Sequence, residues 1–323
     1  MKKVVSFSMG RSSARTALLA MDKYGAKNVD LVLMDTGAEH PLSYKFARDM
    51  VEHFGVTVTC LRGDFSAPLG KGVDFNVVPL SECKYDLKPF KEMMAKYGTP
   101  YIGGMFCTDR MKLQPYKKYC DWKYGKKNYE TILGIRIDEP KRLREKPFIS
   151  YLADICDDEK QDILDFWAEQ VFDLEIEEWN GNCVFCPKKS NLKLAAAQRD
   201  NPELYIDWMD SLSDGSVRKV ESRTVSYMMA IKIKPYALLS NNLSSAKLVA
   251  AKEKYNKNLF TSSNKNWESY EREASLKMYR GNQSLGSLIA TFDGSTGQEI
   301  KARIRGSKMI DTNSCSESCE VFQ

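Results

Sequence analysis

Strand-like and helix-like stretches alternate through the first 61 residues, and this alternation constrains the fold more than any other feature. Short apolar runs typical of buried strands occur at residues 4–8, 29–34 and 56–61. Helix-forming stretches separate them at residues 14–24 and 42–54. Strands joined through helices pair in parallel with right-handed crossovers, and helices then cover both faces of the sheet. The sequence therefore predicts an α/β fold with a parallel twisted sheet.

Length and composition exclude several classes of protein. The chain has 323 residues, of which 43% are hydrophobic, and this is enough for one large domain with an extension. No run approaches the roughly 18–20 apolar residues of a membrane helix. The start Met-Lys-Lys leads into a predicted strand instead of a secretory signal. A net charge of +5 is too small to demand a polyanionic partner. We therefore expect a cytoplasmic protein with no membrane partner.

The turn after the first strand is a candidate anion site. Ser8–Ser13 joins the strand to the start of a helix, where backbone N–H groups lack partners and the helix dipole favours negative charge. Gly10 allows close approach to the backbone. The candidate ligands are these N–H groups, the hydroxyls of Ser8, Ser12 and Ser13, and the guanidinium of Arg11. The spacing matches neither common nucleotide loop, so an ordinary serine N-cap is the alternative interpretation.

Polar residues also follow the second predicted strand. Asp35 and Glu39 fall at the same edge of a parallel sheet as Ser8–Ser13, because the carboxyl ends of parallel strands meet there. They can hold a ribose hydroxyl, an amine or a metal, or they are a strand-end turn and a helix-start carboxylate. His40 is either a helix cap or a ligand contact. With only two histidines in the chain, a Ser–His or Cys–His relay is not expected.

Four motifs in order resemble the PP-loop adenine nucleotide α-hydrolase superfamily, in particular its phosphoadenosine phosphosulfate (PAPS) reductase branch. They are Ser8–Ser13; Asp35-Thr36-Gly37 with His40-Pro41 and Tyr44-Lys45-Phe46; Gly134–Glu139 with Arg142; and Tyr151–Asp154 with Phe166-Trp167. The resemblance covers residues 1–190 and is closest to phage-type members, which would place the protein in the host cytoplasm.

The resemblance implies an adenine nucleotide ligand, PAPS or ATP, and assigns roles to individual residues. Phosphates would lie on Ser8, Gly10, Arg11, Ser12 and Ser13, the nucleoside on Asp35 and Gly37, and the phosphosulfate or pyrophosphate against Arg110, Lys112, Arg136 and Arg142. Met9 stands where many ATP-using relatives have Gly, and Ser12 where they have Asp. The missing Asp removes one Mg²⁺ contact, so the departure favours a sulfonucleotide and leaves Mg²⁺ as an optional cofactor.

The nine cysteines suggest thiol or metal chemistry instead of a disulfide framework. Cys183 and Cys186 form a C-x-x-C, which suits a metal, a redox dithiol or two buried thiols. The resemblance implies that this pair and Cys107 bind a [4Fe–4S] cluster, with zinc or no metal as alternatives and with an open or exogenous fourth ligand. Cys120 is a poor fourth ligand, because thirteen residues of continuous helix span about 20 Å.

The tail contains Cys315 and Cys319. Thioredoxin-dependent sulfonucleotide reductases have a nucleophilic cysteine near the C-terminus, so the resemblance implies that role for Cys319 and thioredoxin as a partner. The Gly and His that follow this cysteine in the family are absent here. The alternatives for Cys319 are a fourth cluster ligand and an unreactive tail thiol.

The stretch Lys112–Lys127 interleaves lysines with tyrosines and a tryptophan. This pattern is found in nucleic-acid contacts and also in solvated helix faces with one buried aromatic stripe. Nucleic acid is therefore an alternative partner.

The C-terminal half is expected to be mostly helical. Apolar spacing predicts helices at 161–174 and at 192–212, the second interrupted near Asn201-Pro202. Alternating polarity around Asp293–Gly297 predicts a β-hairpin at 285–305. We expect a nucleotide-binding domain at 1–190, a helical extension at 191–270, and a hairpin with a cysteine-containing tail at 271–323.

Three functions are compatible with these observations. The first is reduction of an activated sulfate beside the α-phosphate of an adenine nucleotide, with Cys319 as nucleophile. The second is ATP-dependent sulfur transfer to nucleic acid. The third is a nucleotide-binding redox sensor or partner-binding protein without catalytic activity.

Overall fold

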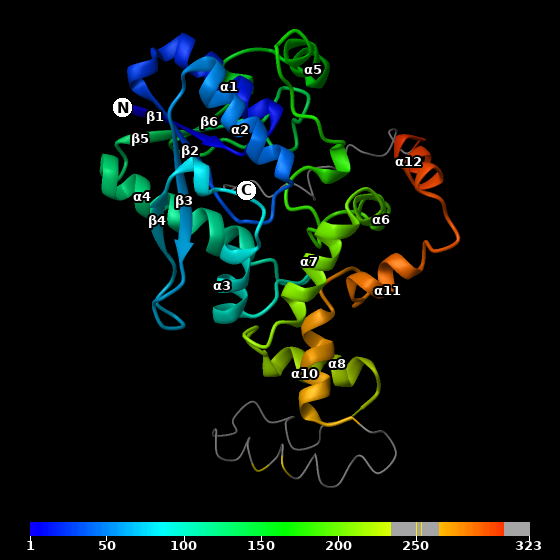
Figure 1. Cartoon of the computed structure of the whole chain (residues 1–323). Helices are drawn as coiled ribbons and strands as arrows, with labels where there is room; N and C mark the ends of the chain where they lie inside the picture. The colour runs from blue at the N-terminus through cyan, green and yellow to red at the C-terminus, as the bar shows by residue number, and fades with distance from the viewer. Residues whose placement is uncertain (234–249, 251–252, 254–264, 307–323) are drawn as a thin grey trace.

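A six-stranded sheet forms the centre of the protein (Figure 1). The computed structural model describes residues 1–233, 250, 253 and 265–306. The strands are β1 (Lys2–Phe7), β2 (Val29–Met34), β3 (Val58–Asp64), β4 (Asp74–Val78), β5 (Tyr129–Leu133) and β6 (Ile149–Tyr151). Their order is β4-β3-β2-β1-β5-β6, and every pair is parallel except β3 with β4. The predicted α/β class with a largely parallel sheet is confirmed.

Helices cover both faces of the sheet because successive strand residues point to opposite sides. Val5 packs in the core beneath α1 (Arg11–Tyr24), α2 (Pro41–Phe54) and α5 (Lys160–Ala168). Its neighbour Val4 is buried on the other face, against α4 (Gln114–Tyr124).

The C-terminal helices extend from the sheet through a second core. The remaining helices are α3 (Lys88–Tyr97), α6 (Asn191–Asp200), α7 (Pro202–Ser213), α8 (Glu221–Ala230), α10 (Trp267–Leu276), α11 (Leu285–Ala290) and α12 (Gly297–Gly306). Phe90 of α3 packs on Trp208 of α7 with ring centroids 4.8 Å apart. The same core includes Ala38, which follows β2, and Leu285 of α11. Figure 1 shows α7 beside α3, with α6 on the far side of α7 from α3.

Several elements match the predicted segments. Strands β1, β2 and β3 and helices α1 and α2 lie where the alternation predicts them. The predicted interruption near Asn201 is confirmed, since α6 ends at Asp200 and α7 begins at Pro202, a residue favoured in the first helical turn. Helix α5 ends at Ala168 and is shorter than the predicted 161–174.

The predicted β-hairpin at 285–305 is wrong, because this segment forms α11 and α12. The Ser284 hydroxyl caps α11 by accepting from the Ser287 N–H at 3.2 Å. Thr296 and Glu299 form a reciprocal capping box before α12, with N–O distances of 2.7 and 3.2 Å. Ile300 and Ile304 then repeat four residues apart on the buried face. The capping box is a sequence signal that outweighs the apparent alternation.

The described residues contain no helix that is both long and apolar enough to span a bilayer. The boundaries proposed at residues 190 and 270 remain a prediction.

Candidate anion site at the reversal of strand order

The strand order reverses at β1, which places two loops beside each other at one edge of the sheet. From β1 the chain proceeds outward to β2 and β3, then crosses back to β5 on the opposite side of β1. In open parallel sheets, ligands bind outside the carboxyl ends of the strands at such a reversal. The loops that follow β1 and β5 here are Ser8–Gly10 and Gly134–Phe148.

The β1–α1 loop presents the start of α1 without a side-chain cap. Gly10 is the N-cap residue and Met9 has a positive φ of 60°. Among the contacts of the described residues, the backbone N–H groups of residues 11–13 have no hydrogen-bond acceptor. Helix α1 also carries no acidic residue in its first turn. These donors and the positive end of the helix dipole therefore suit an anion.

Ser13 shapes this loop from within. Its hydroxyl donates to the Gly10 carbonyl at 2.9 Å and accepts from the Ser8 N–H at 3.1 Å. The Ser8 hydroxyl lies 3.1 Å from the same oxygen. The side chain of Ser13 is thus engaged in the turn, and Ser12 is the serine whose hydroxyl faces the β5 loop.

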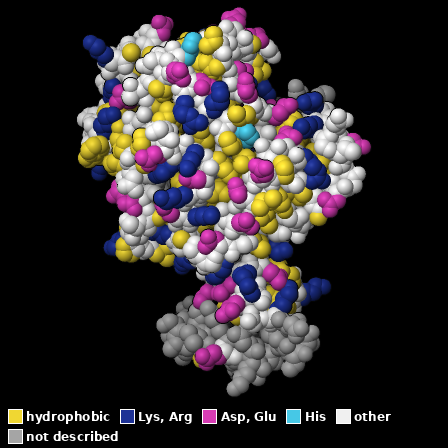
Figure 2. All heavy atoms as spheres, viewed as in Figure 1, with side chains coloured by type: hydrophobic (Ala, Val, Ile, Leu, Met, Phe, Trp, Pro, Cys, Tyr) yellow, Lys and Arg dark blue, Asp and Glu magenta, His cyan; other side chains and the backbone are white. Residues whose placement is uncertain are grey.

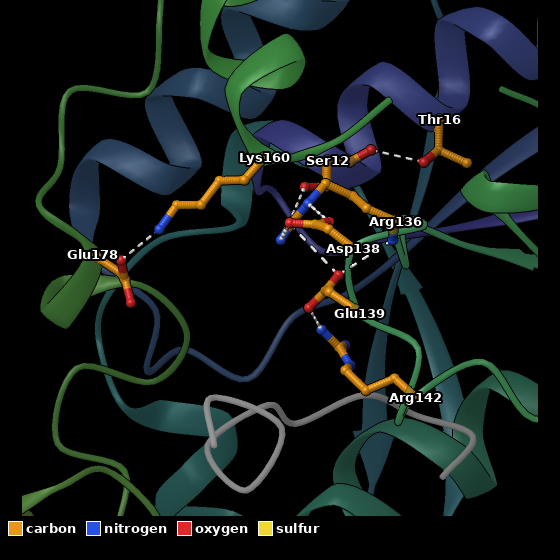
Figure 3. A network of polar contacts seen from close by, with 8 residues as sticks. All are labelled: Ser12, Thr16, Arg136, Asp138, Glu139, Arg142, Lys160 and Glu178. Carbon is orange, nitrogen blue, oxygen red and sulfur yellow. Dashed lines mark hydrogen bonds and ion pairs between the residues drawn. The ribbon is translucent and has the colours of Figure 1, made fainter. Parts of the chain in front are cut away.

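Gly134 brings the β5 loop directly onto α1. A Cβ at this position would lie 2.8 Å from the Ser13 nitrogen and 2.9 Å from the Ser13 Cα. Its backbone has no positive φ, so only the close approach requires glycine here. Two residues later, Arg136 Nη1 donates to the Ser12 hydroxyl at 3.2 Å (Figure 3).

A chain of charged side chains holds Arg136 in place (Figure 3). Arg136 Nε donates to Asp138 at 2.8 Å, and Arg136 N–H donates to Glu139 at 3.2 Å. Arg142 pairs with the other oxygen of Glu139. Two of the three predicted phosphate-facing arginines, Arg136 and Arg142, therefore lie in one network, with Arg136 between Ser12 and the carboxylates.

Asp35 lies at the end of β2, where its carboxylate accepts hydrogen bonds from its own loop, from α2 and from β3. It is completely buried and accepts from Gly37 N–H at 2.9 Å, Tyr44 hydroxyl at 2.9 Å and Arg62 Nε at 2.7 Å. Burial, with the charges of Asp35 and Glu39, raises the pKa of Tyr44 well above its ordinary value. Burial is the largest single influence on the pKa of Arg62 and lowers it, but the hydrogen bond to Asp35 and the charge of Asp35, with smaller contributions from nearby groups, together raise it.

Gly37 is required by two separate constraints. Its φ is +67°, and a Cβ would lie 2.6 Å from Pro89 Cδ. The predicted nucleoside-bordering pair, Asp35 and Gly37, therefore acts on the conformation of the loop. Arg62 was not identified from the sequence, although a charged residue near the end of an apolar strand was the available signal.

Arg11 points away from the start of α1. Its guanidinium makes a two-pronged pair with Asp173, at 2.6 and 2.7 Å, and also donates to the Leu174 carbonyl. Trp167 Nε1 donates to the Arg11 carbonyl at 3.1 Å. These contacts fasten α1 to the segment after α5, and no sequence signal pointed to Asp173.

Lys112 lies in a buried ionic cluster next to the loop after β2. Its Nζ is 3.3 Å from Glu39 Oε1, and the Cys183 thiol lies 3.7 Å from the same oxygen. Lys112 belongs to a π-helical turn, Asp109–Leu113, that leads into α4. In the same turn Arg110 pairs with Asp109 at 3.0 Å and stacks on Tyr97. Within the described residues, Lys112 thus contacts Glu39, and Arg110 contacts Asp109 and Tyr97.

His40 caps a helix. Its Nδ1 accepts from the Leu42 N–H at 3.2 Å, so its Nε2 carries the proton and donates to Asn201 Oδ1 at 2.9 Å. Burial lowers the pKa of His40, with a contribution from Lys189. The sequence left a helix cap or a ligand contact open for His40, and in the structure His40 is the N-cap residue of α2.

Comparison with known proteins identifies a relative that spans the whole chain. The uncharacterized nin region protein ORF290 of Escherichia phage lambda is 38% identical over 326 residues, which cover 100% of this chain and 96% of the phage protein. The chain belongs to the ORF290 family. The uncharacterized protein MJ0066 of Methanocaldococcus jannaschii is 24% identical over 234 residues, covering 65% of this chain and 41% of that longer protein. No family model and no solved structure matches the sequence.

In this member of the ORF290 family, the C-x-x-C forms a tight turn beside the loop after β2. Cys186 N–H donates to the Cys183 carbonyl at 3.2 Å, and Val184 N–H donates to the Ala38 carbonyl at 3.0 Å. The buried ammonium of Lys189 donates to the Trp179 and Val184 carbonyls at 2.6 and 3.0 Å.

The described residues contain no group of three or more His, Cys, Asp or Glu side chains arranged to hold a metal ion. Cys107 and Cys183 pack against the same core, and the [4Fe–4S] or zinc site on Cys107, Cys183 and Cys186 stays a prediction. Cys120 is buried on α4 against the sheet, in a different core from Cys107. Cys315 and Cys319 lie outside the described residues.

Proposed function

We propose that the protein binds an adenine nucleotide by its phosphates at the start of α1, in the manner of the PP-loop proteins. One observation carries the proposal: the N–H groups of residues 11–13 have no acceptor among the described residues at the reversal of strand order, and Arg136 reaches the adjoining Ser12 hydroxyl at 3.2 Å. Helix-start N–H groups and a guanidinium fork are complementary to phosphate and sulfate oxygens.

The chemistry proposed for this site is reduction of a sulfonucleotide such as PAPS. A cysteine thiolate attacks the sulfonate sulfur, and the S–O bond to the nucleotide breaks with the electron pair on the departing phosphate. One thiolate of a dithiol such as thioredoxin then attacks the cysteine sulfur of the S-sulfonated cysteine. A mixed disulfide forms between the two cysteines, and sulfite leaves. The candidate nucleophile is Cys319. Arg136 and the α1 N–H groups would stabilise the charge on the departing nucleotide.

Nucleotide binding is tested by calorimetry on the full chain, with PAPS, ATP and inorganic phosphate titrated separately. The proposal requires saturable binding of PAPS or ATP and at least a tenfold loss of affinity in Arg136→Ala, because a charge-assisted pair is removed. Arg48→Ala is the matched control, since Arg48 is an exposed residue of α2 whose guanidinium donates to the Cys83 carbonyl at 3.4 Å. Equal affinity in both variants contradicts the assignment of the site.

The reaction is tested separately under anaerobic conditions. Sulfite release from PAPS with thioredoxin, lost in Cys319→Ser with nucleotide affinity unchanged, supports the reductase. Release of AMP and pyrophosphate that requires added tRNA or DNA assigns sulfur transfer instead. Binding without any turnover leaves a nucleotide-binding protein and removes the enzymatic part of the proposal.

A further inference from the structure

One tryptophan stands apart from the other four. Trp122 on α4 is 71% exposed, whereas the remaining tryptophans are at most 2% exposed. Its ring meets Phe75 of β4 at 5.9 Å and Tyr119 at 6.1 Å, both tilted by less than 50°. One face of an aromatic ring of this size is therefore left to solvent, where an isolated tryptophan is unfavourable.

The apolar surface continues onto the edge strand β4. Val77 is 56% exposed and pairs with Leu61 across the ladder, so both face the α4 side of the sheet. Within the described residues, β4 pairs only with β3, which makes it the last strand on its side. The half-buried Phe75 and the exposed Val77 and Trp122 thus form one apolar strip between α4 and the edge of the sheet.

Several lysines lie on α4 and in the loop that follows it. Lys117, Lys118, Lys123, Lys126 and Lys127 are exposed. Two of them are neutralised, Lys118 by Asp74 at 3.4 Å and Lys123 by Asp30 at 3.3 Å. Lys117, Lys126 and Lys127 make no ion pair with any described residue. Figure 2 shows hydrophobic and basic side chains together on the side where α4 lies in Figure 1.

The strip lies on the α4 face of the sheet at its β4 edge, whereas α1 covers the other face, and β3 and β2 separate β4 from β1. Helix α4 begins after Lys112, which contacts Glu39 beyond the carboxyl end of β2. It ends at Tyr124, whose hydroxyl donates to Asp30 at 2.6 Å, near the start of β2. A ligand on this surface therefore leaves Arg136 and α1 accessible.

We propose that this surface binds single-stranded nucleic acid. We call it the Trp122 surface and define it by Phe75, Val77, Lys117, Trp122, Lys126 and Lys127. An exposed aromatic ring can stack on any unpaired base, and neighbouring lysines neutralise the backbone phosphates. A duplex keeps its bases stacked on each other, so it offers the ring no equivalent contact. The inference does not depend on the proposed nucleotide site.

The experiment uses the full chain and an unlabelled 16-mer of deoxythymidine. Because Trp122 is the exposed tryptophan, stacking quenches intrinsic fluorescence at this position. Anisotropy of a labelled 16-mer gives affinities for the variants. Trp122→Ala should weaken binding about 5- to 100-fold, the range for losing one base–aromatic stack. Lys117→Glu with Lys126→Glu should flatten the dependence of affinity on salt, by about 0.7 in log–log slope per lost phosphate contact.

The controls separate this surface from general basicity. The double variant Lys88→Glu with Arg303→Glu changes the net charge by the same amount as Lys117→Glu with Lys126→Glu, but at exposed positions of α3 and α12. It should change the affinity for the 16-mer less than twofold. PAPS or ATP affinity should be unchanged in Trp122→Ala. Equal binding of a 16-base-pair duplex, or of polyglutamate at the same charge, overturns the proposal in favour of simple anion attraction. Absence of quenching at 20 mM salt overturns it as well.

Discussion

The Cα of Gly134 lies against the first turn of α1, so close that a Cβ at 134 would be 2.8 Å from the backbone nitrogen of Ser13. This contact joins the loop after β5 to the loop after β1 at the reversal of strand order. It also aligns Arg136, two residues on, with Ser12. The spacing of the candidate anion site therefore depends on the absence of one methyl group.

Gly134→Ala should damage both stability and binding. Overpacking at a backbone contact costs about 1–3 kcal/mol of unfolding free energy, and separating the loops should reduce nucleotide affinity. Urea denaturation and calorimetry measure the two effects. Gly215→Ala is the matched control, because a Cβ at Gly215 meets no atom within 4 Å. If Gly134→Ala behaves like Gly215→Ala in both measurements, the contact does not set the site.

Asp35 and Arg62 should be coupled in stability. Asp35→Ala leaves the Arg62 guanidinium without its carboxylate partner and should cost about 3–5 kcal/mol. Tyr44→Phe removes one of three hydrogen bonds to Asp35 and should cost about 1–2 kcal/mol. The double variant Asp35→Ala with Arg62→Met should lose less unfolding free energy than the sum of the losses in the single variants Asp35→Ala and Arg62→Met. Strict additivity in urea denaturation is the result that rejects this coupling.

Substitution of Arg11 should mainly reduce stability, whereas substitution of Arg136 should mainly reduce nucleotide affinity. Arg11→Ala breaks the two-pronged pair with Asp173 and should reduce stability by about 1 kcal/mol, since both groups are partly exposed. Its nucleotide affinity should stay within about threefold of wild type, whereas Arg136→Ala loses at least tenfold. Arg136→Lys keeps the charge but not the fork and should recover only part of the loss. The reverse ranking of Arg11 and Arg136 would assign phosphate binding to Arg11.

Stability should fall in acid because of His40. Burial lowers the pKa of His40 in the folded state, so the unfolded state binds the proton more readily. This contribution is complete above about pH 6.5 and is lost as the pH falls through the folded pKa, by at most about 1.4 kcal/mol per pH unit. Protonation also places a hydrogen on the nitrogen that accepts from Leu42.

His40→Asn tests this assignment, because asparagine is a good N-cap that does not titrate. The variant should flatten the stability profile below pH 6.5. His53→Asn, at the exposed remaining histidine, should leave the profile as it is. A wild-type slope that persists in His40→Asn assigns the acid sensitivity to other groups.

The sequence predicts the elements whose pattern is local and long. Strands β1–β3 and helices α1 and α2 follow from apolar runs and helix-forming spacing. The edge strand β4 is exposed on most of its residues, and β6 has three residues, so neither produces such a run. The α12 helix was missed because an apparent alternation was preferred to the capping box of Thr296 and Glu299.

The sequence predicted where the loops of the candidate site lie better than it predicted what the individual residues contact. The loops at Ser8–Ser13 and Gly134–Arg142 meet at the sheet edge where ligands bind in this fold class. Asp35 pairs with Arg62, 27 residues away, and Arg11 pairs with Asp173, 162 residues away. No local sequence pattern identifies such distant partners. Conversely, the alternation of lysines and aromatic residues around Trp122 is visible in the sequence. The exposure of Trp122 in the structure is the reason to test this tract for nucleic-acid binding.

The most direct test of the central claim is a titration of the ¹⁵N-labelled full chain with PAPS, and in parallel with ATP, followed through its backbone amide resonances. The account predicts that the amides of residues 10–13 and of Arg136 shift together and saturate with one dissociation constant, which Arg136→Ala increases at least tenfold. If these amides do not move at millimolar nucleotide, or if saturating shifts occur only elsewhere in the chain, the start of α1 does not bind the phosphates.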